Sequence, residues 1–176
     1  MQLLDLGLFI LRLVLGLGFV AHGSQKLFGW FGGGGLKGTA GMMNALGIRP
    51  ASLWAIVAAL SEFGGGLLLL LGFLNPIGSL GIMASMTIAI IRVHWTKGFW
   101  NSSGGFEFPL VNIAAALALA LTGPGLYSLD AALGFSLPEP VSLIVGLILV
   151  ILGVLAAEMS RATQPKAAPT GERTNA

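Results

Sequence analysis

The sequence contains no cysteine. That absence excludes disulfide bridges, thiolate metal sites and any electron relay built on cysteine pairs. Charged residues are also scarce, at 9% of the 176 residues, whereas ordinary soluble domains carry about 25%. The 9 basic residues exceed the 7 acidic ones by only two, and no basic stripe interleaved with aromatic residues is present, so a nucleic-acid partner is not expected.

Apolar residues dominate the chain instead. They account for 55% of the sequence, and the mean hydropathy is +0.89. Several runs are long enough to cross a hydrocarbon core of about 30 Å, so the sequence predicts an all-α integral membrane protein in a lipid bilayer. A short interfacial helix is expected over residues 38–47. The predicted membrane helices cover residues 6–28, 51–74, 77–96, 109–122 and 141–157.

The basic residues predict an orientation. If the N-terminus lies outside, eight of the nine Lys and Arg residues fall in or beside inward-facing segments, and Arg12 is the exception. Cytoplasmic loops carry this excess of positive charge. We therefore predict an external N-terminus and a cytoplasmic C-terminus. The side of the C-terminus reverses if residues 141–157 do not span the membrane.

One carboxylate interrupts the second predicted helix near its middle. Glu62 stands directly before Phe63 and the run Gly64–Gly66, at a depth where a charge costs at least a few kcal/mol. A carboxylate at this depth requires either an ion-pair partner or a functional role. The structural interpretation is an ion pair with Arg92 or Arg12 that fixes helix packing, and the functional one is proton or ligand chemistry.

Other polar residues are predicted to share a depth near the cytoplasmic surface, with Glu62 below them as the floor of a pocket. Such a pocket suits a small amphipathic molecule. A quinone fits, because its carbonyls accept hydrogen bonds, its reduction takes up protons and its tail stays in lipid. The residues at this depth are His22, Lys26, Arg92, His94 and Glu107.

Simpler interpretations exist for several of these residues. Arg92 and Glu107 could form an ion pair that closes the inner ends of two helices. His22 and His94 could ligate a haem from two helices, although two histidines are a thin basis for such a site. Asp130 is expected to act in local capping of an external turn.

Several short motifs occur together in a particular order, and in this order they resemble the DoxX family of small bacterial membrane proteins over residues 6–133. The resemblance implies a four-helix transmembrane bundle over 6–133. Residues 134–158 then form an additional C-terminal transmembrane helix, and 159–176 a disordered cytoplasmic tail. The motifs are Arg12 with Gly23-x-x-Lys26, Glu62-x-Gly64-Gly65-Gly66, His94 with Gly98-Phe99, Gly104-Gly105-Phe106-Glu107-Phe108, and Gly123-Pro124-Gly125-x-x-Ser128-Leu129-Asp130.

The resemblance also carries expectations about activity and place. Members are mostly described as oxidoreductases of the bacterial plasma (inner) membrane, and the related DoxD proteins are subunits of thiosulfate:quinone oxidoreductase. No agreed catalytic assignment and no flavin, haem or metal site follow from it. Electrons would come from a partner redox protein or a soluble reductant. The motif positions carried over are Arg12, Lys26, Glu62, His94 and Glu107.

Three functions remain open from the sequence. In a quinone-linked redox subunit, Glu62 and His94 move protons; the ligand contacts come from Arg12, His22, Lys26, Arg92 and Glu107. In a non-catalytic scaffold or assembly partner, the same charges hold the helices together. A small-molecule carrier is the least favoured, because the chain shows no inverted repeat.

Overall fold

The computed structural model describes residues 3–160, and throughout that range the regular structure is helical. Most of the predicted C-terminal tail, residues 161–176, lies outside the described residues. The helices agree closely with the expected ranges, including the short helix after the first span. In chain order they are α1 (Leu3–Leu27), α2 (Gly35–Ala45), α3 (Ala51–Leu71), α4 (Ile77–Ala89), α5 (Glu107–Thr122), α6 (Leu129–Leu133) and α7 (Val141–Met159).

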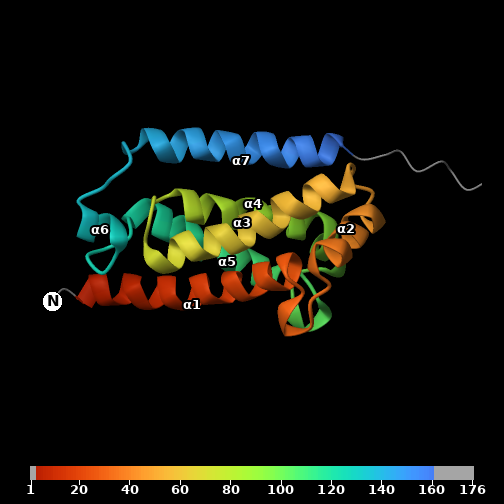
Figure 1. Cartoon of the computed structure of the whole chain (residues 1–176), viewed down its shortest axis with the longest axis horizontal. Coiled ribbons are helices and arrows are strands. Elements are labelled where there is room, and N and C mark those ends of the chain that lie inside the picture. Colours follow the sequence, from red (N-terminus) through yellow and green to blue (C-terminus); the bar gives the residue numbers. More distant parts are fainter. Residues whose placement is uncertain (1–2, 161–176) are drawn as a thin grey trace, which may run out of the picture.

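The long helices lie side by side and alternate in direction, and α7 lies along one side of the bundle (Figure 1). One end of the bundle carries the start of α1, the α3–α4 turn and α6, and we call it the α6 end. The opposite end carries α2 and the segment between α4 and α5, and we call it the α2 end. These two ends organise every polar site described below.

Within residues 3–160, four helices are long and apolar enough to cross a membrane: Leu3–Leu27, Ala51–Leu71, Ile77–Lys97 and Val141–Met159. The additional C-terminal helix is thus confirmed as a helix of spanning length. The apolar α5 has 16 residues, which reach about 24 Å at about 1.5 Å per residue, somewhat less than the hydrocarbon core of about 30 Å. The all-α transmembrane bundle predicted from composition is therefore correct, with α5 as its short member.

Glycines set how closely α1 and α3 approach. A Cβ atom on Gly23 of α1 would overlap the backbone of Phe63 in α3, and one on Gly66 would lie 2.7 Å from the backbone nitrogen of Val20. Helices in lipid associate through such small residues, since no hydrophobic force favours their contact. Gly65 and Gly66 therefore lie at helix contacts, whereas a Cβ on Gly64 would meet nothing within 4 Å.

The C-terminal end of α4 departs from regular α-helix. A π-helical turn covers Ile90–His94, and a 3₁₀ turn, Trp95–Lys97, follows it. A π turn holds more residues per turn than an α-helix, so it rotates every side chain beyond it. A regular α-helix, at about 100° per residue, would place Arg92 on one stripe with the small residues Gly78, Gly81 and Ser85. The π turn breaks that register.

Candidate functional site

A buried ion pair joins α1 to α3 in the interior of the bundle. Lys26 contacts Oε1 of Glu62, and the hydroxyl of Ser85 in α4 donates a hydrogen bond of 2.6 Å to the same oxygen. The side chain of Glu62 is 2% exposed, while that of Lys26 is 25% exposed. Three helices thus contribute to one cluster, Lys26–Glu62–Ser85, which reaches the surface through its lysine.

The two oxygens of the Glu62 carboxylate are in different situations. Oε1 takes both the lysine and the serine, whereas Oε2 is buried and has no hydrogen-bond partner within the described part of the chain. A buried acceptor left without a donor costs about 1–3 kcal/mol. Oε2 of Glu62 can therefore accept a hydrogen bond from one more donor.

The glycines described above position this cluster. Lys26 stands three residues after Gly23, and Glu62 directly precedes the Phe63 backbone that Gly23 touches. On the α4 side, a Cβ on Gly81 would lie 3.1 Å from the carbonyl oxygen of Ser61, so α4 also approaches closely. Close backbone contact on both sides lets a lysine and a serine reach one carboxylate.

The sequence analysis predicted different ion-pair partners for these charged residues. Glu62 was expected to pair with Arg92 or Arg12, but its partner is Lys26. Arg92 was expected against Glu107, but its guanidinium forms an ion pair with Glu158 of α7, in which Nε donates a bond of 2.6 Å. The π turn explains this difference, because it rotates Arg92 from the expected stripe toward α7.

The two histidines do not take part in the cluster. His22 is exposed on α1 and lies beside Phe19, with ring centroids 6.4 Å apart. His94 is half-buried, and its Nδ1 lies 2.6 Å from the carbonyl oxygen of Gly104. Because a carbonyl only accepts, Nδ1 carries the proton and Nε2 remains available as an acceptor when the ring is neutral.

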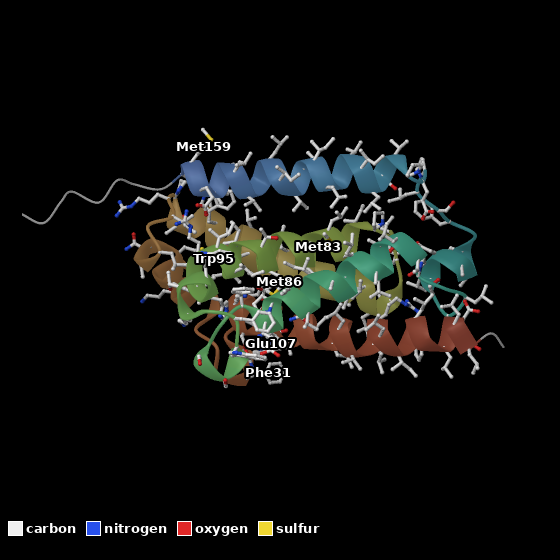
Figure 2. All side chains as sticks on the ribbon, turned by 180° about the vertical axis from the view of Figure 1, so that it is seen from behind. Phe31, Met83, Met86, Trp95, Glu107 and Met159 are labelled. Atoms are coloured by element: carbon white, nitrogen blue, oxygen red, sulfur yellow. The ribbon has the colours of Figure 1, made fainter. Side chains whose placement is uncertain are left out.

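Glu107 organises the loop at the α2 end. It begins α5, and its Oε2 accepts a hydrogen bond of 2.9 Å from the backbone N–H of Asn101. Aromatic rings gather in the same loop, with Trp95 stacked on Phe106 at a centroid distance of 5.3 Å. Figure 2 shows Phe31, Trp95 and Glu107 at this end of the bundle, while Met83 and Met86 lie nearer its middle.

Arg12 lies away from Glu62, at the α6 end. It is 2% exposed, and its Nη2 donates to the carbonyl oxygen of Tyr127. Nearby, the Asp130 carboxylate accepts bonds of 3.0 Å from the backbone N–H groups of Leu74 and Asn75. Asp130 thus has the structural role expected of it, although it holds the α3–α4 turn, while Ser128 caps α6.

Two residues of these sites were missed by the sequence reasoning. Ser85 shares a helical stripe with Gly78 and Gly81, but nothing in that pattern indicates its bond to Glu62. Glu158 fell at the end of the predicted additional C-terminal helix, residues 134–158, and nothing local marks it as the partner of Arg92. Over residues 3–160, no group of three or more His, Asp or Glu residues is arranged to hold a metal ion.

Two cavities of the described region lie away from the predicted pocket. The polar pocket was predicted beside Glu62, whereas these two cavities lie at the α6 end, one lined by Arg12 and one by Asp130. The Glu62 side chain is 2% exposed, and Lys26 is the more exposed member of the pair. The site is therefore a buried ionic cluster near the surface of a membrane bundle.

Apolar spans, close glycine contacts and an interior ion pair define a multi-pass helical membrane protein. The pattern of the DoxX family matches residues 7–95, which contain α1 to α4 and the whole Lys26–Glu62–Ser85 cluster. The chain belongs to the DoxX family. No solved structure gives a significant match to it.

Curated relatives agree with this assignment. The chain is 32% identical over 129 residues to Inner membrane protein YqjF of Escherichia coli. The aligned region covers 73% of this chain and 93% of that protein. Inner membrane protein YphA of the same organism is 34% identical, over 70% and 87% of the two chains. Putative oxidoreductase CatD of Bacillus subtilis is 30% identical, over 72% and 86%. The spans and these relatives make the chain a multi-pass protein of a bacterial inner membrane.

Proposed function

We propose that this chain is the membrane subunit of a quinone-linked redox system, and that the Lys26–Glu62–Ser85 cluster binds the polar head of a quinone-like molecule. The observation that carries the proposal is the buried Oε2 of Glu62, which no donor satisfies within the described residues. The hydroxyl group of a reduced quinone is a donor of the required kind. The similarity to a protein named as an oxidoreductase supports the same reaction class.

Each member of the cluster has a definite role in this proposal. Glu62 accepts a proton from the reduced molecule, or returns one during reduction, and acts as general base or acid. Lys26 stabilises negative charge that develops on the ligand oxygen. Ser85 holds Oε1 at 2.6 Å, so Oε2 stays directed at the ligand. A quinone supplies a couple of two electrons and two protons, and a partner redox protein or soluble reductant supplies or takes the electrons.

Access would run along the exposed member of the cluster. The side chain of Lys26 is 25% exposed, and aromatic residues follow it, with Phe28 packed edge-on against Phe63 at 5.5 Å. Phe28 and Trp30 are themselves exposed. Aromatic rings at a membrane surface suit both a flat ring and a lipid-like tail. His94, with Nε2 available, remains a candidate second proton carrier at the same end.

The test is binding of a short-chain benzoquinol to the purified protein in nanodiscs, compared with Glu62→Gln. The substitution keeps the shape of the side chain but removes the basic oxygen, so we expect at least about tenfold weaker binding, the size of one lost charge-assisted bond of about 1.5–3 kcal/mol. Glu139→Gln, an exposed carboxylate at the α6 end, is the matched control. Unchanged affinity in a folded Glu62→Gln protein would overturn the proposal.

A non-catalytic scaffold is the second candidate, and two observations favour it. The two cavities at the α6 end are not lined by Glu62, and the two ion pairs of the described residues connect helices, α1 to α3 and α4 to α7. In a scaffold, Glu62→Gln and Arg92→Gln lower thermal stability in detergent while quinol binding stays absent in all proteins, including wild type. That pattern separates the two functions.

A further inference from the structure

The α6 end contains a buried cation whose hydrogen-bonding capacity is largely unused. Arg12 is 2% exposed, and one of its terminal nitrogens donates to Tyr127. Its Nε and Nη1 are buried and have no hydrogen-bond partner within residues 3–160. Gly72, at φ 62°, packs directly against this guanidinium, where a Cβ would overlap Nη1. The absence of a side chain at Gly72 therefore allows its backbone to lie against the Arg12 guanidinium.

A very small cavity lies beside Arg12. Its volume is about 10 Å³, and Arg12 and Ser79 both line it. Ser79 is 1% exposed, and its hydroxyl likewise has no partner in the described region. A cavity of this size holds at most a single water molecule. A water there would have two donors from Arg12 and a hydroxyl from Ser79, within the two to four polar partners that buried waters use.

A wider pocket adjoins the small cavity. Its volume is about 220 Å³, and Asn75 and Pro124 line both spaces. Ser136 and Glu139, which help to form its wall, are exposed, so the pocket opens to the surface at the α6 end. The shared wall residues place the two spaces next to each other, so solvent in the wider pocket would lie close to Arg12.

The charged residues at this end of the bundle determine which ions can enter the wider pocket. Asp130 and Glu139 line the wider pocket, which no Lys or Arg lines. Asp5, at the same end, is buried with one carboxylate oxygen on the N–H of Leu126. This end of the bundle thus holds three carboxylates and one guanidinium. An anion in the wider pocket would be repelled by this excess of negative charge.

We propose that the α6 end is a hydrated, anion-excluding vestibule that ends in one water molecule held between Arg12 and Ser79. The hydrated path stops there. Leu15, Phe19, Leu69 and Ile82 form an apolar cluster in the core, and Ile82 lies between Ser79 and Ser85 on α4. Solvent from the α6 end therefore does not reach Glu62, whose access is through Lys26. Water at Arg12 does not require a ligand at Glu62, so either proposal can fail alone.

The absence of cysteine allows a direct test of the vestibule. Ser136→Cys places a thiol in the wider pocket. The probes are a trimethylammonium and a sulfonate methanethiosulfonate reagent of similar size. We expect Ser136→Cys to react at least about tenfold faster with the cation, because an acidic cleft concentrates cations. An equal or faster reaction with the anion would overturn the proposal.

A second measurement addresses the water itself, without any variant. In an experimental structure at a resolution that shows ordered water, we expect one water within about 2.7–3.2 Å of both Arg12 and the Ser79 hydroxyl. A halide at that position, or a guanidinium that bonds to protein groups alone, would contradict the assignment. Labelling tests the path from the surface, and the experimental structure tests for the water molecule at its inner limit. The second measurement needs no variant, so it still tests the proposal if the cysteine variant fails to fold.

Discussion

At the scale of single residues, the ionic chemistry of this protein depends on asymmetry within each pair. Glu62 is buried at 1% exposure, but its lysine partner reaches the surface. A lysine can withdraw its charge to the interface because its long stem is flexible, whereas a buried carboxylate has no such escape. The two residues of the pair should therefore respond differently to neutralisation.

We predict that Lys26→Gln destabilises the protein more than Glu62→Gln does. The lysine variant leaves a buried carboxylate without its cation, a loss of about 3–5 kcal/mol for fully buried pairs. In the glutamate variant the freed lysine can turn to the interface, so we expect about 1–2 kcal/mol.

Thermal unfolding in one detergent, followed by the loss of helical circular dichroism, measures the difference. At about 2–4 °C per kcal/mol for chains of this size, the lysine variant should melt several degrees below the glutamate variant. Equal melting points, or the reverse order, would show that the ion pair is not buried as described.

At the scale of elements, glycine contacts and loop clamps decide how the helices meet. Gly23 permits α1 to touch the backbone of α3, and this contact sets the distance between Lys26 and Glu62. At the opposite end, the Asp130 carboxylate holds the α3–α4 turn, where Leu74 has φ 56°, a conformation uncommon for residues other than glycine. Both features lie outside the ionic cluster but fix its geometry.

We predict opposite effects for alanine at two glycines of α1. Gly23→Ala would overlap the backbone of Phe63, and overpacking of this kind costs about 1–3 kcal/mol. Gly18→Ala meets nothing within 4 Å, and alanine favours a helix by about 1 kcal/mol. The melting temperature should fall for the first and stay equal or rise for the second. A neutral Gly23→Ala would show that α1 and α3 pack further apart.

We predict that Asp130→Asn weakens the α3–α4 turn. The amide of asparagine has one acceptor oxygen, so one of the two N–H groups of Leu74 and Asn75 loses its partner, at about 1–3 kcal/mol. Amide hydrogen exchange of residues 72–75 should rise, as should the rate of thermal unfolding. The exposed Glu139→Gln is the control and should change neither. Unaltered exchange in Asp130→Asn would contradict the clamp.

At the scale of the whole molecule, the chain is a bundle with an added helix. Residues 7–95 carry the family pattern, while α7 follows later and leaves most of its apolar surface exposed, as a lipid-facing helix does (Figure 1). Its charged contact with the bundle is the Arg92–Glu158 ion pair, and the N–H of Arg49 donates a 3.2 Å bond to the carbonyl oxygen of Ser160. Both contacts hold its C-terminal end.

We predict that Glu158→Gln loosens the C-terminal end of α7. Losing this partly buried pair should cost about 1–2 kcal/mol, which corresponds to about tenfold faster amide exchange at 1.4 kcal/mol. The change should appear in the last turns of α7 and not in α1 or α3. Glu107→Gln removes a carboxylate from the same end of the bundle and should leave α7 unchanged. Equal protection of α7 in both variants would refute the role of Glu158.

The sequence by itself determined the class and the course of the chain. Hydropathy, helix length and the positions of Gly and Pro are local properties, so they predicted the membrane spans, the short helix before the second span and the additional C-terminal helix. The positions of charged residues within apolar runs singled out Lys26 and Glu62, and their membership of a functional site stays a prediction. The predicted membrane orientation depends on charge bias, which the fold does not test.

Only the tertiary structure decided which charges meet. Ion-pair partners depend on the rotation of each helix and on close approach between residues far apart in the sequence. The π turn at Ile90–His94 rotates Arg92 so that it pairs with Glu158. The close contact at Gly23 brings Lys26 to Glu62. At the α6 end, Arg12 is buried by packing against the turns there. A pattern at about 100° per residue cannot foresee a change of helical pitch, and a sequence does not show which of several cations a buried acid will reach.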